Sequence, residues 1–225
     1  FSSSCTVYGV PDKIPVKETA LIKPAFSPYG YTKQVGERVL TDFFKTKPNS
    51  SLTLLRYFNP IGAHPSALIG ELPIGVPSNL VPYITQTGIG KRKKLTVFGK
   101  DYDTDDGTCI RDYIHVVDLA NAHVASLKKG LNSKESIKTY NVGTGKGVSV
   151  LEVISAFEKV SNQKLNYEFG PRRDGDVPEI YSDNELIKTE LGWEAKFSLE
   201  DCLEHSWKWE KNLVNFKYKS EKKQD

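Results

Sequence analysis

Tyr29 and Lys33 are the residues in this sequence whose types and spacing best suit chemistry. They follow Ser27 and Pro28, a pair typical of a helix N-terminus, and would therefore lie side by side on one helical face. A cation beside a phenol lowers the pKa of the phenol, and a fall from about 10 to about 7 requires about 4 kcal/mol. The pair could act as a general base near neutral pH.

Taken alone, this spacing is common in long chains and also fits an ordinary surface pair. A segment about 20 residues upstream gives it context, because Ser2 to Ser4 has the pattern of a strand end and Val7-Tyr8-Gly9 follows it. Doubly wound sheets place their active sites at the carboxyl ends of parallel strands. The serines and the Tyr-Lys pair are therefore expected to meet there.

Strand and helix patterns alternate over most of the chain, which indicates an α/β protein. Strands are expected over 52–58 and 113–117, and helices over 28–45 and 119–128. Asp118, Ser149, Asp183 and Ser198 are the expected helix N-caps, with Ser149 and Glu152 forming a capping box. The first helix is predicted to pack through an apolar face made of Val35, Val39, Leu40, Phe43 and Phe44.

The composition fits a globular protein, since 38% of the 225 residues are hydrophobic and 26% are charged. The net charge of +3 lies partly in residues 216–225, an expected basic tail, and no basic stripe indicates a nucleic-acid partner. Cys5, Cys109 and Cys202 lack the spacing of a disulfide framework or a metal site. No apolar run approaches the roughly 20 residues that span a bilayer, so no membrane contact and a cytoplasmic location are expected.

Other patterns are interpreted as structural. Residues 143–147 are glycine-rich but lack phosphate-loop spacing, which favours a strand-to-helix turn. The acidic run 101–106 is interpreted as a solvated loop. Structural roles are also expected for the scattered histidines and for the aromatic residues near the C-terminus: His64, His115, His123, His205, Trp207, Trp209, Phe216 and Tyr218.

Longer motifs resemble those of UDP-glucose 4-epimerases, within the extended short-chain dehydrogenase/reductase family. They are LRYFNPIGAHPS (55–66), IGE (69–71), VFGKDYDTDDGT (97–108), RDYIHVVDLA (111–120) and GPRRDGDVP (170–178). The resemblance implies an NAD-binding doubly wound (Rossmann-type) parallel sheet, here incomplete, with a smaller C-terminal α/β substrate domain. Residues 1–60 would belong to the NAD-binding domain and 61–215 mainly to the UDP-sugar domain, with 107–130 returning to the former.

The resemblance also implies residue roles. Tyr29 would be the catalytic base, Lys33 its partner, and Ser4 a bridge to the 4-hydroxyl of the sugar. NAD would be contacted by Ser2, Ser3, Tyr29, Lys33, Tyr57 and Phe58. The UDP-sugar would be contacted by Ser4, Asn59, Asn79, Leu80, Phe98, Arg111, Tyr113, Arg173, Asp176 and Ile180. Two arginines with fork-shaped donors suit a diphosphate.

The expected reaction is interconversion of UDP-glucose and UDP-galactose by NAD-dependent, transient oxidation at C4 of the sugar, in galactose metabolism. Alternatives are another nucleotide-sugar dehydratase or decarboxylase, and a non-catalytic NAD-sensing module. A dehydratase would carry Asp-Glu where Cys5-Thr6 stand, and a module without activity would not need Ser4, Tyr29 and Lys33 together. A homodimer is compatible with the resemblance.

The chain begins at Phe1 and contains no methionine, so it is expected to be a piece of a longer protein. The glycine-rich turn that holds the NAD pyrophosphate in such folds is not in this sequence. Residues 1–225 expressed alone are therefore predicted to aggregate, to bind NAD poorly and to show no epimerase activity. Size-exclusion chromatography and NAD quantification check this. A monodisperse fragment that carries stoichiometric NAD would contradict it.

Overall fold

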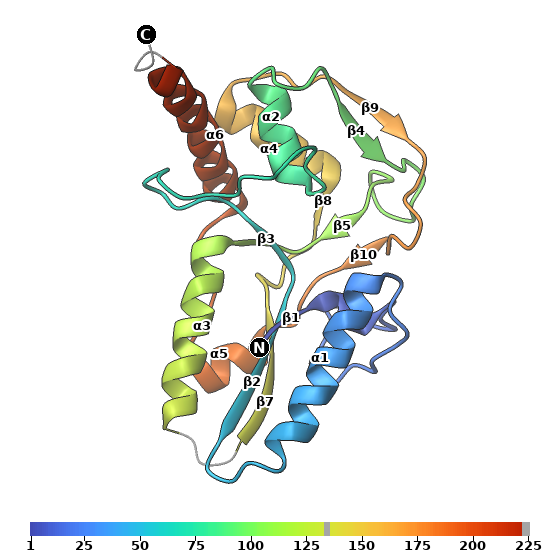
Figure 1. The fold of residues 1–225 in the computed structure, drawn as a ribbon. Helices are drawn as coiled ribbons and strands as arrows, with labels where there is room; N and C mark the ends of the chain where they lie inside the picture. Colours follow the sequence, from blue (N-terminus) through green and yellow to red (C-terminus); the bar gives the residue numbers. More distant parts are fainter. Residues whose placement is uncertain (133–135, 222–225) are drawn as a thin grey trace.

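The computed structural model describes the backbone of residues 1–132 and 136–221, and the side chains of these ranges up to residue 213. Strands and helices alternate along the chain (Figure 1). The strands are β1 (Ser2–Ser4), β2 (Ser51–Tyr57), β3 (Asn59–Ile61), β4 (Leu95–Phe98), β5 (Ile110–Arg111), β6 (Tyr113–His115), β7 (Ser136–Val142), β8 (Val148–Ser149), β9 (Tyr167–Gly170) and β10 (Glu179–Ile180). The helices are the short 3-10 helix η1 (Cys5–Tyr8) and α1 (Pro28–Phe44), α2 (Leu80–Gly88), α3 (Val116–Leu131), α4 (Val150–Ser161), α5 (Glu185–Leu191) and α6 (Leu199–Glu221).

The lower part of the molecule in Figure 1 is a parallel sheet with strand order β1-β2-β7. Helix α1 lies on one side of this sheet, and α3 and α5 lie on the other, as expected for a doubly wound fold. The side facing α3 and α5 is apolar: Leu55, Ala122, Tyr140, Val142 and Ile187 belong to one buried cluster. The predicted α/β class is confirmed, and β2 is nearly the strand expected over 52–58.

Helix α1 has nearly the predicted bounds, but most of its predicted apolar face is exposed, and only Leu40 and Phe44 of that face are partly buried. The hydroxyl of Ser27 accepts a hydrogen bond from the Gly30 amide and caps the helix, as expected. Val35, Val39 and Phe43, however, are 42%, 60% and 52% exposed. Only Gly30 and Glu37 of this helix are buried, so α1 turns a polar face toward the sheet.

The upper part of the molecule holds the largest buried cluster, in which α2, α4 and α6 surround β4, β6 and neighbouring residues. Phe157 of α4 meets Trp207 of α6 edge to face, at 5.5 Å between ring centroids. Trp207 thus packs the C-terminal helix as predicted, and Trp209 donates a hydrogen bond to the Glu71 carbonyl. The side chains of Phe216 and Tyr218 lie outside the described residues. Helix α6 runs to Glu221, so the first part of the predicted tail is helical.

Short strands join the two parts. Strand β3 pairs with β6, and β5 pairs with both β10 and β8. The predicted domain boundaries need a correction here, because β7 completes the lower sheet and α5 packs beside it. Residues 136–142 and 185–191 therefore lie with the sheet, although they were expected in the substrate domain. The order of elements along the chain did not indicate that these two segments lie beside the lower sheet.

The helix caps show where local sequence signals hold. Ser149 and Glu152 form the predicted capping box of α4, and Ser198 accepts from the Asp201 amide at the start of α6. Asp183 accepts from the amide of Glu185, the first residue of α5, but the N-cap of this helix is Asn184, one residue after the predicted cap. Asp118 is not the cap of α3, since the helix begins two residues earlier and His115 caps it.

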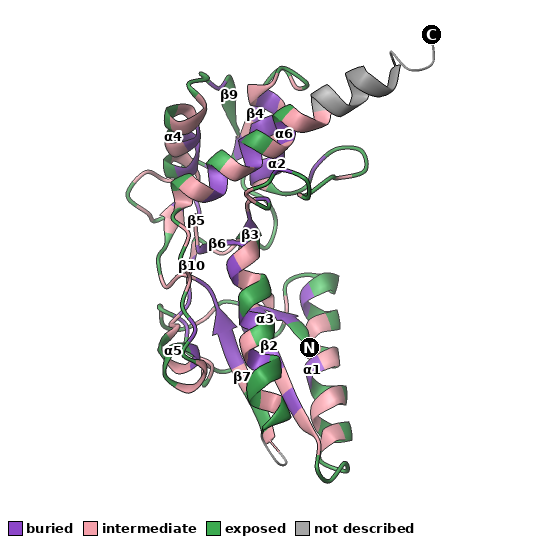
Figure 2. Cartoon of the chain, turned by 90° about the vertical axis from the view of Figure 1, so that its left-hand side faces the viewer, coloured by how far each residue is buried: buried purple, intermediate pink, exposed green. Residues whose placement is uncertain are grey.

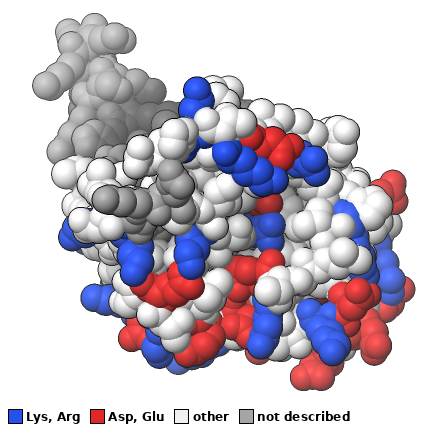
Figure 3. Space-filling view, turned by 90° about the horizontal axis from the view of Figure 1, so that it is seen from below, with Lys and Arg blue, Asp and Glu red and all other residues white. Residues whose placement is uncertain are grey.

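The exposed charges of the lower end are mixed in sign. Figure 3 shows basic and acidic side chains beside one another on the face seen from below. Pairs such as Arg38 with Asp42 and Lys138 with Glu190 account for part of this mixing. Across residues 1–132 and 136–221, no helix combines the length and the apolar character needed to cross a membrane.

His115 is a fully buried residue between β6, α3 and α6. Its Nδ1 accepts a hydrogen bond from the Val117 amide, which leaves the ring proton on Nε2, 3.0 Å from Nδ1 of His205. Burial, followed by repulsion from His205, lowers the pKa of His115 to about 4, although Asp118 and Asp201 act in the opposite direction. The ring is therefore neutral in the folded protein at neutral pH.

This burial predicts an acid-dependent loss of stability. Because the folded-state pKa is lower than the unfolded value of about 6.5, the unfolded state binds more protons as the pH falls from 6.5 toward 4. We therefore compare the parent protein with His115→Asn, which keeps a capping oxygen. Between pH 6.5 and 4.5, the free energy of unfolding should fall by about 2 kcal/mol less in the variant than in the parent protein. Urea unfolding of the complete protein at several pH values measures this difference.

The exposed residue His64 provides the control. His64→Gln should change the pH dependence of unfolding much less than His115→Asn does, since this ring is exposed and is only the weakest of the influences on the pKa of His115. If His115→Asn and the parent protein lose stability in parallel over this pH range, another group causes the acid sensitivity.

Candidate active site

The Tyr-Lys pair lies against the strand that carries the serines. The Lys33 Nζ is 5.4 Å from the centre of the Tyr29 ring and donates a hydrogen bond of 2.9 Å to the main-chain oxygen of Ser2. Tyr29 is 56% exposed, and its hydroxyl has no hydrogen-bond partner within the described part of the chain. The phenol therefore has a cation beside it and remains available to a ligand.

A glycine lets this helix start close to the end of β1. A Cβ at position 30 would lie 3.1 Å from the Ala25 side chain and 3.3 Å from the Thr6 carbonyl, so a larger residue would push α1 away from η1. Ser4 is 7% exposed, and its hydroxyl accepts from the Thr6 amide at 3.3 Å. The serine expected to contact substrate thus holds the turn that follows β1.

Tyr57 links the sheet to α3. Its hydroxyl donates to the Ser2 Oγ at 2.8 Å and also contacts Nε2 of His123. Burial raises the pKa of Tyr57, the hydrogen bond to Ser2 opposes this, and the nearby Tyr29 adds to the rise. Tyr57, Ser2, Lys33 and Tyr29 therefore form one polar group beside the end of β1.

The side chains of two residues expected to contact NAD, Ser3 and Phe58, are engaged within the protein. The Ser3 side chain is buried and donates to Glu37 Oε1 at 2.5 Å, so its hydroxyl is already used. The ring of Phe58 is 3% exposed and packs in the core near Val16 and Ile180, rather than against a surface that a nicotinamide could reach. Side chains alternate along a strand, which explains why Ser3 points away from Ser2 and Ser4.

The residues expected to contact the UDP-sugar are partly brought together. Arg111 of β5 lies 3.4 Å from Asp176, and β10 places Ile180 directly beside Arg111. Ile180 is buried in the cluster that also contains Cys5 and Phe58. Cys5 directly follows β1 and Phe58 directly follows β2. Strand β10 thus connects Arg111, which is expected to bind the diphosphate, to the carboxyl end of the β1-β2-β7 sheet.

A second group lies at the ends of β4 and β9. The Arg173 guanidinium is 4.0 Å from the centre of the Phe98 ring, which is 36% exposed. Asn79 is the N-cap residue of α2 and donates to the Glu71 carboxylate at 2.9 Å, while Leu80 packs against the upper core. No hydrogen bond in the described ranges joins this group to Tyr29 or Ser4.

Two further residues that are expected to contact the UDP-sugar lie in the pair of short strands, β3 and β6, that joins the lower and upper parts. Asn59 begins β3 and pairs with Tyr113 of β6. Tyr113 is 7% exposed within the upper core, and burial raises the pKa of its hydroxyl. Its hydroxyl is therefore neutral and mostly shielded from solvent.

Sequence reasoning missed Asp112, which stands between Arg111 and Tyr113. This fully buried carboxylate accepts from the amide and hydroxyl of Thr144, the Gly145 amide, and the amide and hydroxyl of Ser182. It holds residues 143–147 beside the segment that follows β10; these residues were expected to be a strand-to-helix turn and form the loop from β7 to β8, which directly precedes α4. A charged residue immediately before the apolar strand expected over 113–117 was the signal that could have indicated Asp112.

The available side chains suit a neutral or anionic organic ligand. Lys33 has no carboxylate partner in the described structure, so its charge can act on a ribose or a nicotinamide-bearing ligand. Across residues 1–132 and 136–213, no set of three His, Cys, Asp or Glu side chains is arranged to hold a metal ion. The donor set therefore fits an NAD-type cofactor at the end of β1.

Sequence comparison assigns the protein to a class already indicated by the sheet and the Tyr-Lys pair. A family model described as GDP-mannose 4,6 dehydratase matches residues 1–206, and the chain belongs to this family, within the extended short-chain dehydrogenases. It is 52% identical to UDP-glucose 4-epimerase of Bacillus subtilis over 96% of this chain, and 50% identical to that of Haemophilus influenzae over 94%. The predicted resemblance to UDP-glucose 4-epimerases is confirmed.

Solved structures give the same result for the fold. UDP-glucose 4-epimerase of Bifidobacterium longum in complex with NAD+ and UDP is 46% identical, with a TM-score of 0.92 over 96% of this chain and 64% of that one. The enzyme of Stenotrophomonas maltophila, with bound NAD and formylated UDP-arabinopyranose, is 49% identical with a TM-score of 0.92, over 96% and 63%. The chain spans about 63% and 62% of the two curated relatives.

Proposed function

We propose that the complete protein containing this chain interconverts UDP-glucose and UDP-galactose, and thus serves galactose metabolism. The observation that carries the proposal is the contact of Lys33 with both the Tyr29 ring and the strand of Ser2 to Ser4. Relatives that are about half identical and are named UDP-glucose 4-epimerase support the same activity.

The cofactor in this proposal is NAD, which would supply a reversible hydride acceptor for C4 of the sugar. Lys33 would hold the nicotinamide ribose, and Tyr57 and Ser2 would line the same place. Phe58 would contribute through its main chain, since its ring is in the core. Solved relatives that contain NAD support this assignment.

Tyr29 would take the proton of the 4-hydroxyl group and later return it. The ammonium of Lys33 stabilises the phenolate that this transfer requires, and Ser4 would hydrogen-bond the same hydroxyl. For the product to differ from the substrate, the 4-keto sugar must present its other face before the hydride returns. The protein must therefore hold the UDP firmly and the sugar loosely.

Arg111 and Arg173 would hold the diphosphate, with Asp176 accepting from the uridine ribose and Phe98 stacking near the uracil. Arg111 already contacts Asp176, and Arg173 already lies over Phe98, so each cation is positioned before a ligand arrives. Asn59, Asn79, Leu80, Tyr113 and Ile180 would complete the contacts to the UDP-sugar.

A 4,6-dehydratase is the alternative that the description of the family model suggests. The turn after Ser4 argues against it, because Cys5-Thr6 stands where an acidic pair would be expected. Cys5 is buried, and burial raises the pKa of its thiol to about 12, so it cannot replace a carboxyl group in acid-base chemistry.

The remaining parts of the proposal are the setting and the assembly. Cys5, Cys109 and Cys202 are free and buried, which supports a reducing compartment such as the cytoplasm. A homodimer is also proposed, since Tyr31, Val35, Val39 and Phe43 form an exposed apolar row on α1 that a second copy could cover.

Tyr29→Phe tests the assigned base. In the complete protein, we expect UDP-sugar binding to remain nearly unchanged and kcat to fall at least about a hundredfold, because only proton transfer is removed. Lys33→Met should change kcat in the same direction. A coupled assay for UDP-glucose formation and a calorimetric titration with UDP-galactose provide the two measurements. Near-normal epimerisation by Tyr29→Phe would exclude this role.

Ile180 tests the room at the sugar. Its intermediate size predicts some activity on UDP-N-acetylglucosamine, and Ile180→Ala is expected to increase that activity relative to UDP-glucose. Removing a buried side chain also costs about 2–5 kcal/mol of stability, so Ile180→Val is the milder companion. The ratio of kcat/KM for the two sugars is the measurement. If neither the parent protein nor Ile180→Ala acts on the N-acetylated sugar, Ile180 does not limit the site.

A further inference from the structure

Helix α1 carries Tyr29 and Lys33 but makes little apolar contact with the sheet beyond the packing of the Phe1 ring against Gly36. In the described part of the chain, none of its side chains belongs to any of the three buried hydrophobic clusters. Figure 2 shows the helix mainly in the colours of exposed and intermediate residues. Hydrophobic burial is non-directional and would normally choose which face of a helix meets the sheet. Another interaction must therefore set the rotation of α1 about its axis.

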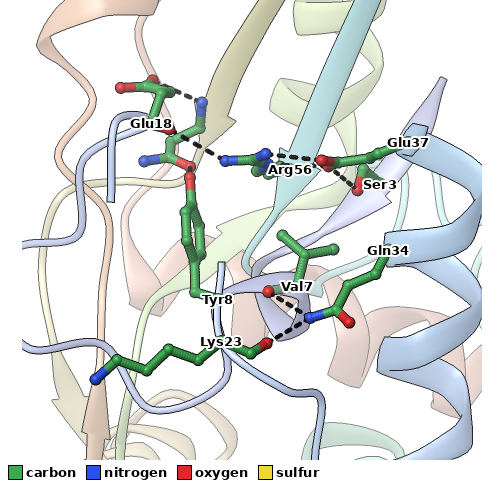
Figure 4. A network of polar contacts seen from close by, with 9 residues as sticks. Ser3, Val7, Tyr8, Glu18, Lys23, Gln34, Glu37 and Arg56 are labelled. Carbon is green, nitrogen blue, oxygen red and sulfur yellow. Dashed lines mark hydrogen bonds and ion pairs between the residues drawn. The ribbon is translucent and has the colours of Figure 1, made fainter. Parts of the chain in front are cut away.

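Glu37 provides that interaction. It follows Tyr29 and Lys33 at successive steps of four residues, so the three side chains share one face of α1. Its carboxylate accepts from the Ser3 hydroxyl of β1 at 2.5 Å, and from Nε and Nη2 of Arg56 of β2 at 2.9 and 2.7 Å (Figure 4). One carboxylate thus binds the helix to two adjacent strands.

Arg56 is fixed in turn by its surroundings. It is 6% exposed, its guanidinium lies 4.8 Å from the centre of the Tyr8 ring, and its Nη1 donates to the Glu18 carbonyl at 3.2 Å. Burial is the largest single influence and would lower the pKa of Arg56, but hydrogen bonding and charge interactions with Glu37 and Tyr8 together outweigh it and raise the pKa. The partner of Glu37 is therefore a charged group that cannot swing away into solvent.

Glu37 and the proposed catalytic residues of α1 contact the same short strand, β1. Ser3 binds Glu37 through its hydroxyl, Ser2 receives Lys33 through its main-chain oxygen, and Ser4 is the expected substrate contact. A rotation of α1 that displaced Glu37 from Ser3 would move Tyr29 and Lys33 in the same sense. A buried ion pair often adds little stability compared with apolar residues, but it accepts only a narrow geometry.

We propose that Glu37 and Arg56 are positioning residues, whose buried ion pair sets the rotation of α1 and thereby places Tyr29 and Lys33 against the serine strand. The expected effect on kcat rests on the proposed function. The expected effect on the orientation of α1 does not depend on that function. Displacements of about 1 Å at a reacting group can cost on the order of a hundredfold in rate, so the pair acts on kcat more than on binding.

The test separates positioning from stability in the complete protein. Glu37→Gln keeps the size of the side chain and removes its charge, and should lower kcat about tenfold or more with KM for UDP-galactose within about twofold. The double variant Glu37→Leu/Arg56→Met replaces the ion pair with apolar groups, which should restore the melting temperature lost in Glu37→Leu. Its kcat should nevertheless stay at least about tenfold low.

Glu210→Gln is the matched control. Glu210 is also a buried carboxylate, paired with Lys91 and located on α6 in the upper part of the molecule, away from the serine strand. Its replacement should lower the melting temperature and leave kcat unchanged. A loss of kcat in Glu210→Gln comparable to that in Glu37→Gln would show that general destabilisation explains both, and would overturn the proposal.

Hydrogen exchange gives a readout that does not depend on turnover. Amides in residues 31–37 should exchange faster in Glu37→Gln and in the double variant than in the parent protein, with α4 as the unchanged reference. A double variant with parental kcat and parental exchange in α1 overturns the positioning role. If the parent protein shows no epimerisation with NAD and UDP-galactose, the proposed function fails instead, and the exchange experiment still decides the role of Glu37.

Discussion

The connection between the lower and upper parts of this molecule depends on the hydrogen bonds that the carboxylate of Asp112 accepts. This carboxylate is completely buried and receives five hydrogen bonds from Thr144, Gly145 and Ser182, with no cation among these donors. A buried charge is costly unless such donors satisfy it, so the three segments must stay together. Even Gly143 is constrained, because a Cβ there would lie 2.3 Å from Asp112 Oδ2. Arg111 and Tyr113, on either side, are thereby fixed between the parallel sheet and the upper core.

The segment before α1 extends this connection to the other side of the sheet. Val16 receives a hydrogen bond at its carbonyl from Asp183 and donates its amide to the Tyr181 carbonyl, while Asn141 of β7 also donates to the Val16 carbonyl. Strand β10 and the end of β7 are therefore held by one extended residue. Because Ile180 and Ser182 belong to the same stretch, the same contacts hold the proposed sugar contact and the residues around Asp112 in place.

Polar rather than apolar contacts dominate wherever the proposed catalytic residues are placed. Lys33 binds a main-chain oxygen, Gln34 donates to the carbonyls of Val7 and Lys23, and Glu37 binds Ser3 and Arg56. Directional contacts of this kind define an orientation, whereas apolar surfaces tolerate sliding and rotation. Two of the three apolar cores lie behind α3 and within the upper part, and the third packs around η1 and Phe58, next to Ser4. Tyr29 belongs to none of the three.

The sequence by itself determined what depends on neighbours along the chain. The i, i+4 geometry of a helix places Lys33 beside Tyr29, and the cap at Ser27 and the capping box at Ser149 form from residues three positions apart. The alternation of strand and helix patterns also predicted the α/β class, which the structure confirms, and the family motifs suggested the residues of the candidate site.

Tertiary structure decided which faces of these elements are buried. The apolar row of α1 was expected to meet the sheet, yet Glu37 does so because Ser3 and Arg56 lie there, on strands 34 and 19 residues away in sequence. The ring of Phe58 entered the core, His115 replaced Asp118 as the cap of α3, and β7 joined β2 in the lower sheet. Each of these outcomes depends on partners distant in the chain, and periodicity within one segment carries no information about them.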